Sequence, residues 1–136
     1  MNASDSQRVV PVLVYEDIEA AQRFLVRAFG FEASALDRDG EGRAVHGEVS
    51  TGGAVMWLHR VTADHGLVSP RSLPAASGGL VVMVDDVDAH HRRASEAVAT
   101  VERPPSDMPY GQREYSARDP EGARWYFAKR LSPGPR

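Results

Sequence analysis

The sequence predicts an α+β fold in which two βαβββ repeats form a curved mixed sheet, a cup, with the helices on its convex side. A β-branched segment precedes an amphipathic helical segment twice along the chain, and short segments separated by turn residues follow each of them. One such unit is too small to bury its own sheet. We therefore expect the two units to pair around one core.

The first repeat begins with a strand at Val9–Tyr15, and Pro11 places this strand at an edge or start of the sheet because proline cannot donate to a ladder. Asp17 is expected to cap a helix whose apolar residues recur at helical spacing, and Gly30 is expected to end it. The following strands are predicted at Phe31–Asp37, Arg43–Thr51 and Ala54–His59, with turns at Asp39–Gly42 and Gly52-Gly53.

The second repeat follows the same plan, with a strand at Leu80–Val84 and a helix capped by Asp86. The inner stripe of this helix is predicted to consist of Val87, His91, Ala94 and Val98. This stripe places His91 at the edge of the core and leaves His90 in solvent. The remaining strands are predicted at Thr100–Arg103, Arg113–Arg118 and Arg124–Ala128, with a turn at Asp119–Gly122.

The repeat is also visible residue against residue. LVYEDIEAA (Leu13–Ala21) aligns with VMVDDVDAH (Val82–His90), and HGEVST (His46–Thr51) aligns with QREYSA (Gln112–Ala117). A duplication of this kind fixes the architecture of the domain before any single element is assigned.

The length of 136 residues suits a single domain, which we expect at 8–131. Its first half is expected at about 8–60 and its second half at about 79–131. The Ser-, Pro- and Gly-rich linker 61–78 is long enough to move or to act as a lid. The small and polar ends, 1–7 and 132–136, are expected to be flexible.

Composition excludes several classes of function. The chain has no cysteine, which rules out disulfides, thiol catalysis and Cys-ligated zinc and fits a reducing cytoplasm. A net charge of -3 without a basic stripe argues against nucleic-acid binding. The start of the chain lacks the pattern of a signal peptide, and no apolar run is long enough to span a membrane. We therefore expect a cytoplasmic protein.

The segments YEDIEAAQRFLVRAFGFE in the first half, and VDDVDAHHRRA and PPSDMPYGQREYSARDPEGARWYF in the second, resemble the glyoxalase/bleomycin-resistance/dioxygenase (vicinal oxygen chelate) superfamily. The resemblance covers Val9 to Ala128, and the paired motif with DPEG before an apolar strand is fairly specific. The most similar branch includes peptide-antibiotic-binding resistance proteins. The resemblance implies a cup formed by the concave sheet and a homodimer in which the partner often completes each cup.

In catalytic members of this superfamily, four side chains from the first and last strands of the two halves hold a divalent metal. The resemblance places these positions at Val10, Trp57, Gly79 and Tyr126. None of them is His, Asp or Glu, whereas divalent ions need oxygen or nitrogen donors at about 2.0–2.2 Å. A shift by one residue would turn the side chains away from the cup. We therefore expect no metal and no cofactor.

Trp57 and Tyr126 are predicted to form an aromatic wall at the place of the missing metal, suited to stacking a planar ligand. The alternative is that they fill a collapsed cup. Strand alternation places polar residues of two strands on the same face, towards the cup or solvent. These are His46, Glu48 and Ser50, and Gln112, Glu114 and Ser116. Trp125 and Phe127 alternate with Tyr126 and are expected in the core.

Two further residues complete the predicted ligand site. Arg124 shares the face of Tyr126, and its guanidinium is predicted to contact an anionic or carbonyl group of the ligand. His59 lies near the predicted mouth of the cup. The favoured function is metal-independent binding of a small molecule, such as antibiotic sequestration, with an aromatic or peptide antibiotic as ligand. The first alternative is a lyase or isomerase that uses His46, Glu48 or Glu114 for acid/base chemistry. The second is a structural subunit without a ligand.

Overall fold

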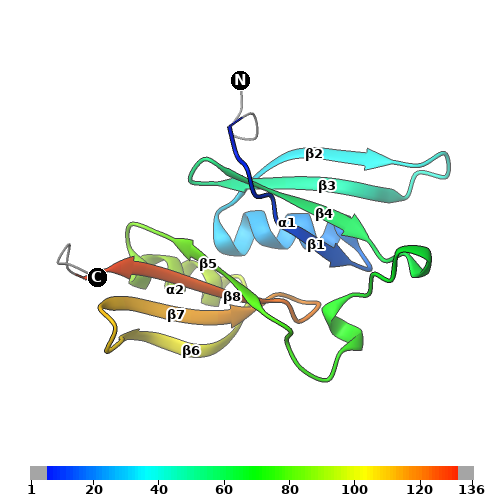
Figure 1. Cartoon of the computed structure of the whole chain (residues 1–136). Coiled ribbons are helices and arrows are strands. Elements are labelled where there is room, and N and C mark those ends of the chain that lie inside the picture. The colour runs from blue at the N-terminus through cyan, green and yellow to red at the C-terminus, as the bar shows by residue number, and fades with distance from the viewer. Residues whose placement is uncertain (1–5, 132–136) are drawn as a thin grey trace.

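The first half of the chain forms a mixed four-stranded sheet with the order β1-β4-β3-β2, in which β1 and β4 are parallel. The computed structural model describes residues 6–131. In Figure 1, β2 and β3 of this sheet lie above α1. The elements are β1 (Val12–Tyr15), α1 (Ile18–Phe29), β2 (Glu32–Arg38), β3 (Ala44–Thr51) and β4 (Ala54–Arg60).

The second half repeats this topology with the order β5-β8-β7-β6, and β5 is parallel to β8. The elements are β5 (Gly79–Met83), α2 (Val87–Glu96), β6 (Thr100–Asp107), β7 (Gln112–Arg118) and β8 (Arg124–Arg130). The two sheets lie one above the other in Figure 1, and α1 packs against α2. The predicted fold class, two βαβββ repeats of mixed strands and helices, is confirmed.

Capping residues set the helix ends as predicted. The Asp17 carboxylate accepts a hydrogen bond from the backbone N–H of Ala20 at 3.0 Å, and Asp86 does the same for Ala89 at 3.0 Å. Gly30 ends α1 in the left-handed conformation with φ 76°, which glycine adopts without steric penalty.

The inner face of α2 differs from the prediction. The helix ends at Glu96, and Val98 is exposed with φ 64° instead of completing an apolar stripe. His90, predicted to be solvated, stacks on Phe127 with ring centroids 4.1 Å apart. Its Nδ1 accepts from the Tyr115 hydroxyl at 2.6 Å, and its Nε2 donates to the Phe29 carbonyl at 2.9 Å. His90 is therefore the histidine that joins the core.

The largest differences from the expected strand ends are in β1 and β6. The first strand begins at Val12 instead of Val9, although Pro11 still accepts a hydrogen bond from Trp57 at 2.9 Å. Strand β6 continues to Asp107 instead of ending at Arg103. Its pairing with β7 is irregular between Arg103 and Ser106, where two prolines cannot donate to the ladder.

One apolar core connects the two halves. Phe31, just before β2, meets Trp125 of β8 with ring centroids 5.4 Å apart. The ring centroids of Phe29, at the end of α1, and Phe127 are 4.7 Å apart. All four side chains are buried. Trp125 and Phe127 thus face the helices, as strand alternation predicts.

Polar contacts also join the halves to the linker. The Tyr15 hydroxyl donates to the buried Asp119 carboxylate at 2.5 Å. Glu121, also buried, accepts the backbone N–H of Glu16 at 2.7 Å and the hydroxyl of Ser69 at 2.6 Å. Ser69 belongs to the linker, which contains two short 3-10 turns, Ala63–His65 and Pro70–Ser72. This part of the linker is packed on the domain.

The N-terminal end of the described chain is also attached to the sheet. The Gln7 side-chain amide donates to the Val55 carbonyl at 3.0 Å and accepts the Val55 N–H at 2.8 Å. Gln7 therefore extends the ordered edge beyond the predicted start at residue 8. The other expected flexible residues, 1–5 and 132–136, lie outside the described part of the chain, and Ser6 lies within it.

Candidate functional site

The first-half residues of the predicted site lie together on the face of the sheet opposite α1. Glu48 of β3 pairs with Trp57 of β4, and His46 pairs with His59. Val49, which alternates with Glu48, is fully buried on the helix side. The His46 and Trp57 rings meet edge to face with centroids 6.0 Å apart. The Trp57 side chain remains 39% exposed.

The polar side chains of this first-half set make few polar contacts. The His46 Nδ1 lies 3.3 Å from a carboxylate oxygen of Asp37 on the neighbouring strand. The Glu48 carboxylate accepts the Ser34 hydroxyl at 3.1 Å, and the His59 Nδ1 lies 2.7 Å from the carbonyl of Arg60. Each of these contacts is made to a residue outside the predicted site.

The second-half residues occupy the corresponding face of the other sheet. Tyr126 of β8 pairs with Ser116 of β7, and Glu114 lies two residues along the same strand. Ser116 and Glu114 are both buried. Burial of a carboxylate requires hydrogen-bonding partners because the lost hydration must be replaced.

Glu114 has a hydrogen-bond donor and an ion-pair partner among nearby side chains. The Gln112 side-chain amide donates to it at 3.2 Å, and an Arg103 guanidinium nitrogen lies 3.8 Å away. Tyr110, in the turn before β7, also hydrogen-bonds to Glu114, and this bond raises the pKa of the tyrosine above its usual value. Tyr110 and Arg103 are not among the predicted site residues, because Tyr110 lies in a turn and Arg103 stands at the predicted end of its strand.

An ion-paired cluster fixes Arg124. Its Nε donates to Glu102 at 3.0 Å, and Arg118 donates to the other oxygen of the same carboxylate at 2.7 Å. The hydrogen bond from Arg118, followed by that from Arg124, lowers the pKa of Glu102. Hydrogen bonding with Tyr126, followed by that with Glu102, raises the pKa of Arg124 above its usual value. The charge of Arg124 is therefore already matched by Glu102.

The strand ladders fix which residues of the two repeats correspond. Trp57 and Tyr126 are counterparts, because each lies opposite the equivalent valine of β1 or β5. Since Trp57 also pairs with Glu48, and Tyr126 with Ser116, Glu48 corresponds to Ser116.

This correspondence corrects the sequence alignment of the two halves. His46 corresponds to Glu114, whereas the alignment placed it against Gln112 and placed Glu48 against Glu114. The turn between β7 and β8 is longer than that between β3 and β4, and a comparison of short segments does not detect this difference. The shift is two residues, so the predicted faces remain unchanged.

The two halves of the predicted site do not meet within one chain. Between described residues, no hydrogen bond, ion pair or ring contact joins the first-half set to the second-half set. Each set instead borders exposed apolar side chains. Val12, opposite Trp57, is 49% exposed, and Val81, opposite Tyr126, is 58% exposed. Each face is therefore half of a possible cup.

The positions at which the superfamily holds a metal do not fit one in this chain. Val10 and Trp57 provide no carboxylate or imidazole, and neither does Tyr126. At Gly79, an added Cβ would lie 3.0 Å from Cε2 of Tyr126, so the tyrosine ring occupies the space of a side chain there. In the part of the chain that the structure describes, no group of three or more His, Cys, Asp or Glu side chains is placed to hold a metal.

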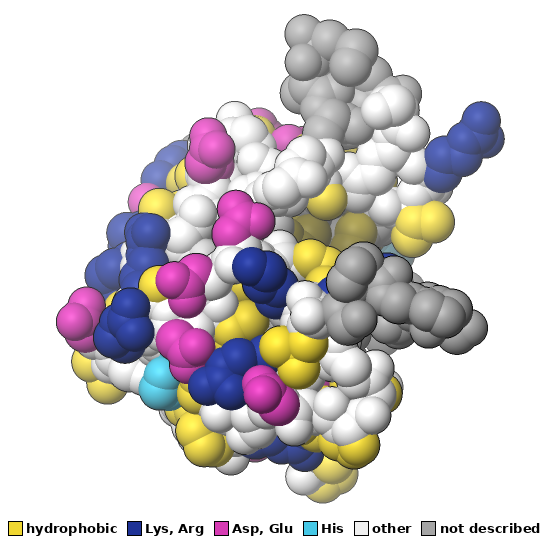
Figure 2. Space-filling view, turned by 90° about the vertical axis from the view of Figure 1, so that its left-hand side faces the viewer, with side chains coloured by type: hydrophobic (Ala, Val, Ile, Leu, Met, Phe, Trp, Pro, Cys, Tyr) yellow, Lys and Arg dark blue, Asp and Glu magenta, His cyan; other side chains and the backbone are white. Residues whose placement is uncertain are grey.

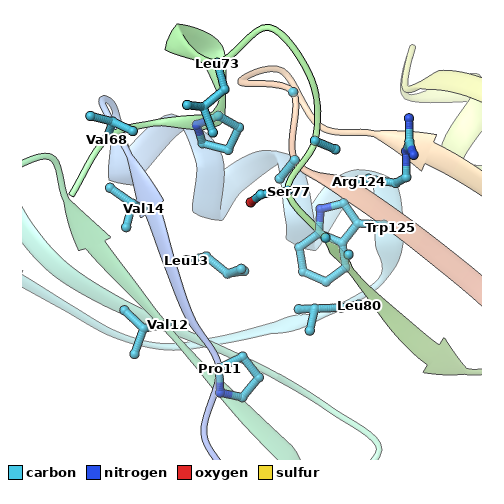
Figure 3. Close-up of a pocket in the computed structure, with 16 residues that line it drawn as sticks. Pro11, Val12, Leu13, Val14, Val68, Leu73, Ser77, Leu80, Arg124 and Trp125 are labelled. Carbon is cyan, nitrogen blue, oxygen red and sulfur yellow. The ribbon is translucent and has the colours of Figure 1, made fainter. Parts of the chain in front are cut away.

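A separate hollow of about 320 Å³ lies between β1, the linker, β5 and β8 (Figure 3). Of the predicted ligand-binding residues, only Arg124 borders it. On the face of the molecule that Figure 2 shows, basic and acidic side chains are interspersed with hydrophobic ones, and no continuous basic stripe is visible there. Within residues 6–131, no helix has the length and apolar character needed to cross a membrane.

The fold and the two half-sites define a paired βαβββ domain of the vicinal-oxygen-chelate type. A sequence profile of the Glyoxalase/Bleomycin resistance protein/Dioxygenase superfamily matches residues 8–127. The chain belongs to this superfamily. It is 32% identical to TioX from Micromonospora sp. ML1, whose crystal structure superposes with a TM-score of 0.73 over 92% of this chain and 99% of that chain.

Other solved structures share the fold. A glyoxalase-related enzyme from Fulvimarina pelagi is 25% identical, with a TM-score of 0.71 over 90% of this chain and 87% of that chain. A glyoxalase/bleomycin resistance protein/dioxygenase from Nocardioides is 19% identical, with a TM-score of 0.69 over 94% of this chain and 87% of that chain. None of the curated proteins compared with this chain matches it.

Proposed function

We propose that this protein binds a planar or aromatic small molecule without a metal and sequesters it in the cytoplasm. The exposed Trp57 indole is the observation that carries the proposal. It lies on the sheet face where catalytic relatives hold a metal, beside His46 and Glu48. A rigid aromatic side chain with polar neighbours provides a stacking surface together with groups that orient a ligand.

A homodimer is the second part of the proposal. One chain contributes an aromatic first-half face and a separate second-half face, and each borders exposed apolar residues, Val12 and Val81. A second copy related by twofold symmetry covers such faces and brings the Trp57 set of one chain opposite the Tyr126 set of the other. The ligand would then lie between two aromatic side chains.

The biological role that we propose for this binding is the sequestration of an antibiotic. The superfamily that includes bleomycin resistance proteins supports it, as does a site in which stacking replaces metal coordination. Binding alone suffices for sequestration, so the Val and Gly residues at the metal positions are compatible with it.

One observation favours a second candidate, a lyase or isomerase. The His46 imidazole lies 3.3 Å from Asp37, and a carboxylate that orients an imidazole is the usual arrangement of a general base. Glu48 and the buried Glu114 are the other candidate acid/base groups. Turnover that survives a chelator and is lost in His46→Ala would support this candidate, whereas binding without product formation supports sequestration.

Replacement of Trp57 tests the proposed binding site. Trp57→Ala should weaken binding of planar and peptide antibiotics roughly 30-fold, because truncation of a central aromatic contact typically costs about 2 kcal/mol. Trp57→Phe should retain most of the affinity. Titration by indole fluorescence and calorimetry measures the change. Equal affinity of wild type and Trp57→Ala would show that stacking on this residue is not the basis of binding.

Trp125→Ala is the matched control for the same residue type. Trp125 is fully buried, so its truncation should reduce the free energy of unfolding by roughly 3–5 kcal/mol. Trp57→Ala should fold with nearly unchanged stability. Urea denaturation of the two variants therefore tests the assignment of sheet faces, and the reversed result would show that the site has been placed on the wrong face.

Metal content and oligomeric state are tested on the untagged protein. Elemental analysis should find no stoichiometric zinc, nickel, iron or manganese, because the four family positions lack suitable donors. Light scattering at tens of micromolar, a rough working concentration, should report a dimer. A stoichiometric metal would refute the first expectation, and a monomer would refute the second.

A further inference from the structure

The hollow at the junction of the two halves borders both half-sites, because Val12, Gly79 and Arg124 line it, but it does not include their aromatic side chains. It lies between β1 and the start of β8, and linker residues cover one side of it (Figure 3). Trp57 and Tyr126 do not belong to its lining. Its volume of about 320 Å³ is at the lower end of the range for small-molecule sites, roughly 300–1,000 Å³.

Most of the side chains that line this hollow are apolar. In Figure 3 the Leu13 side chain extends into its centre, and the Ser77 hydroxyl also points inward. Arg124 lies at the margin with its side chain turned away from the centre, and its guanidinium is engaged by Glu102. The remaining apolar lining side chains are those of Pro11, Val12, Val14, Val68, Pro70, Leu73, Ala76, Leu80, Ala123 and Trp125.

The linker side of the hollow is held in place by buried hydrogen bonds. Ser69, only 1% exposed, lies between the lining residues Val68 and Pro70 and donates its hydroxyl to Glu121 at 2.6 Å. The other oxygen of that carboxylate accepts the backbone N–H of Asp17 at 2.9 Å. The wall is therefore preformed, and a ligand need not order it on binding.

We propose that this junction hollow is a second binding site, which takes a compact, neutral, apolar molecule. Among residues 6–131, no acidic side chain lines it, and the one cationic side chain in its lining, Arg124, is paired with Glu102 outside the hollow. A charged ligand would therefore lose hydration without gaining a partner. The ligand would contact β1 of one half and β8 of the other. It would therefore stabilise the junction between the halves as well as occupy the hollow.

Two dyes with the same skeleton test the chemistry. N-phenylnaphthylamine is neutral, and its sulfonated analogue, anilinonaphthalene sulfonate, is an anion. In Trp57→Ala, which lacks the stacking surface proposed for planar ligands in the cup, the neutral dye should bind with one site per chain and increased fluorescence, whereas the anion should bind at least roughly tenfold more weakly. Equal binding of the two dyes, or no binding of the neutral one, would overturn the proposal.

Space-filling variants test the location. Leu73→Trp, on the linker wall, should abolish binding of the neutral dye, and Ala76→Phe should do the same through a different lining residue. Leu131→Trp is the matched control, because Leu131 is exposed and lies outside the hollow. Binding that survives in both folded lining variants would contradict the assigned position.

Energy transfer from Trp125 to the neutral dye distinguishes this site from the proposed cup and needs no substitution in the hollow. The chain has two tryptophans, and Trp57→Phe leaves only Trp125, which lines the hollow. In this variant the neutral dye should still bind with unchanged affinity and quench the Trp125 emission. Loss of dye binding in Trp57→Phe and Trp57→Ala would place the dye in the cup and refute the junction site. Antibiotic binding measured in the same variants reports on the cup independently.

Discussion

Two turns of the molecule share the sequence pattern Asp-x-Glu-Gly and form the same backbone structure, but one is exposed and the other is buried. In the turn at 39–42, the Asp39 carboxylate accepts the backbone N–H groups of Glu41 at 2.9 Å and Arg43 at 3.0 Å. In the turn at 119–122, Asp119 accepts those of Glu121 at 3.1 Å and Ala123 at 3.0 Å. The local sequence therefore specifies one turn twice.

The environment gives the two aspartates different roles. The second carboxylate oxygen of Asp39 lies 3.5 Å from the exposed Arg43 side chain. The corresponding oxygen of Asp119 accepts the hydroxyl of Tyr15 at 2.5 Å and the indole N–H of Trp125 at 3.1 Å. Hydrogen bonding, first from the Arg43 backbone, lowers the pKa of Asp39, whereas burial raises that of Asp119.

This difference shows how the buried copy of one local motif connects the two halves of the domain through hydrogen bonds. Asp119 connects the turn to β1, and Glu121 connects it to the start of α1 and to the linker. The side chain of Glu41, its counterpart in the exposed turn, pairs only with the neighbouring Arg43 side chain within the described part of the chain. The stability of the domain should therefore depend on the buried turn much more than on the exposed one.

The largest effect is expected for Asp119→Ala. The change leaves the Tyr15 hydroxyl and the Trp125 indole N–H without their partner in the interior, at about 1–3 kcal/mol for each orphaned donor. The free energy of unfolding should fall by roughly 2–5 kcal/mol. Asp39→Ala, the matched control, removes the same backbone acceptor at the surface and should cause only a small loss. Urea denaturation that gave equal losses would contradict the distinction between the turns.

A smaller effect is expected for Glu121→Gln. One carboxylate oxygen of Glu121 accepts from Glu16 N–H and Ser69, and the other accepts from Asp17 N–H. A glutamine places an N–H₂ donor against at least one of these donors, at about 1–3 kcal/mol. Glu41→Gln should be close to neutral. Thermal unfolding measures both, and unchanged stability of Glu121→Gln would mean that this carboxylate does not hold the linker.

The smallest effect is in the pH dependence, where the two aspartates should act in opposite directions. Because the pKa of Asp119 is raised from its ordinary 3.8, its contribution is present at low pH and is lost as pH rises through the folded-state value. Because the pKa of Asp39 is lowered from the same value, its contribution is present above 3.8 and is lost as pH falls.

Asn variants separate these two contributions. Asp119→Asn should reduce the loss of stability on raising the pH above about 3.8, and Asp39→Asn should reduce the loss on lowering the pH below it. The free energy of unfolding measured from acidic to neutral pH gives both slopes. A steeper decline at rising pH in Asp119→Asn than in wild type would contradict the direction of the Asp119 shift.

Local patterns in the sequence were sufficient for the repeat, the helix caps and the sheet faces. Asp17 and Asp86 cap their helices as predicted, and alternation correctly separated Trp57 from the buried Trp125. These features depend on residues within a few positions of one another. For the same reason, the sequence did not show that His90 replaces His91 in the core, because the partners of His90 come from Phe29 and β7.

The sequence by itself determined that two βαβββ units pair and which residues of a strand share a face, because strand parity is a local property. Only the tertiary structure decided that Asp119 is buried while Asp39 is not, since Tyr15 and Trp125 reach Asp119 through the packing of two halves. It also decided that the two predicted aromatic walls lie on separate sheets and that the junction hollow lies apart from them. Such relations depend on how surfaces distant in the chain are brought together, and no local pattern encodes them.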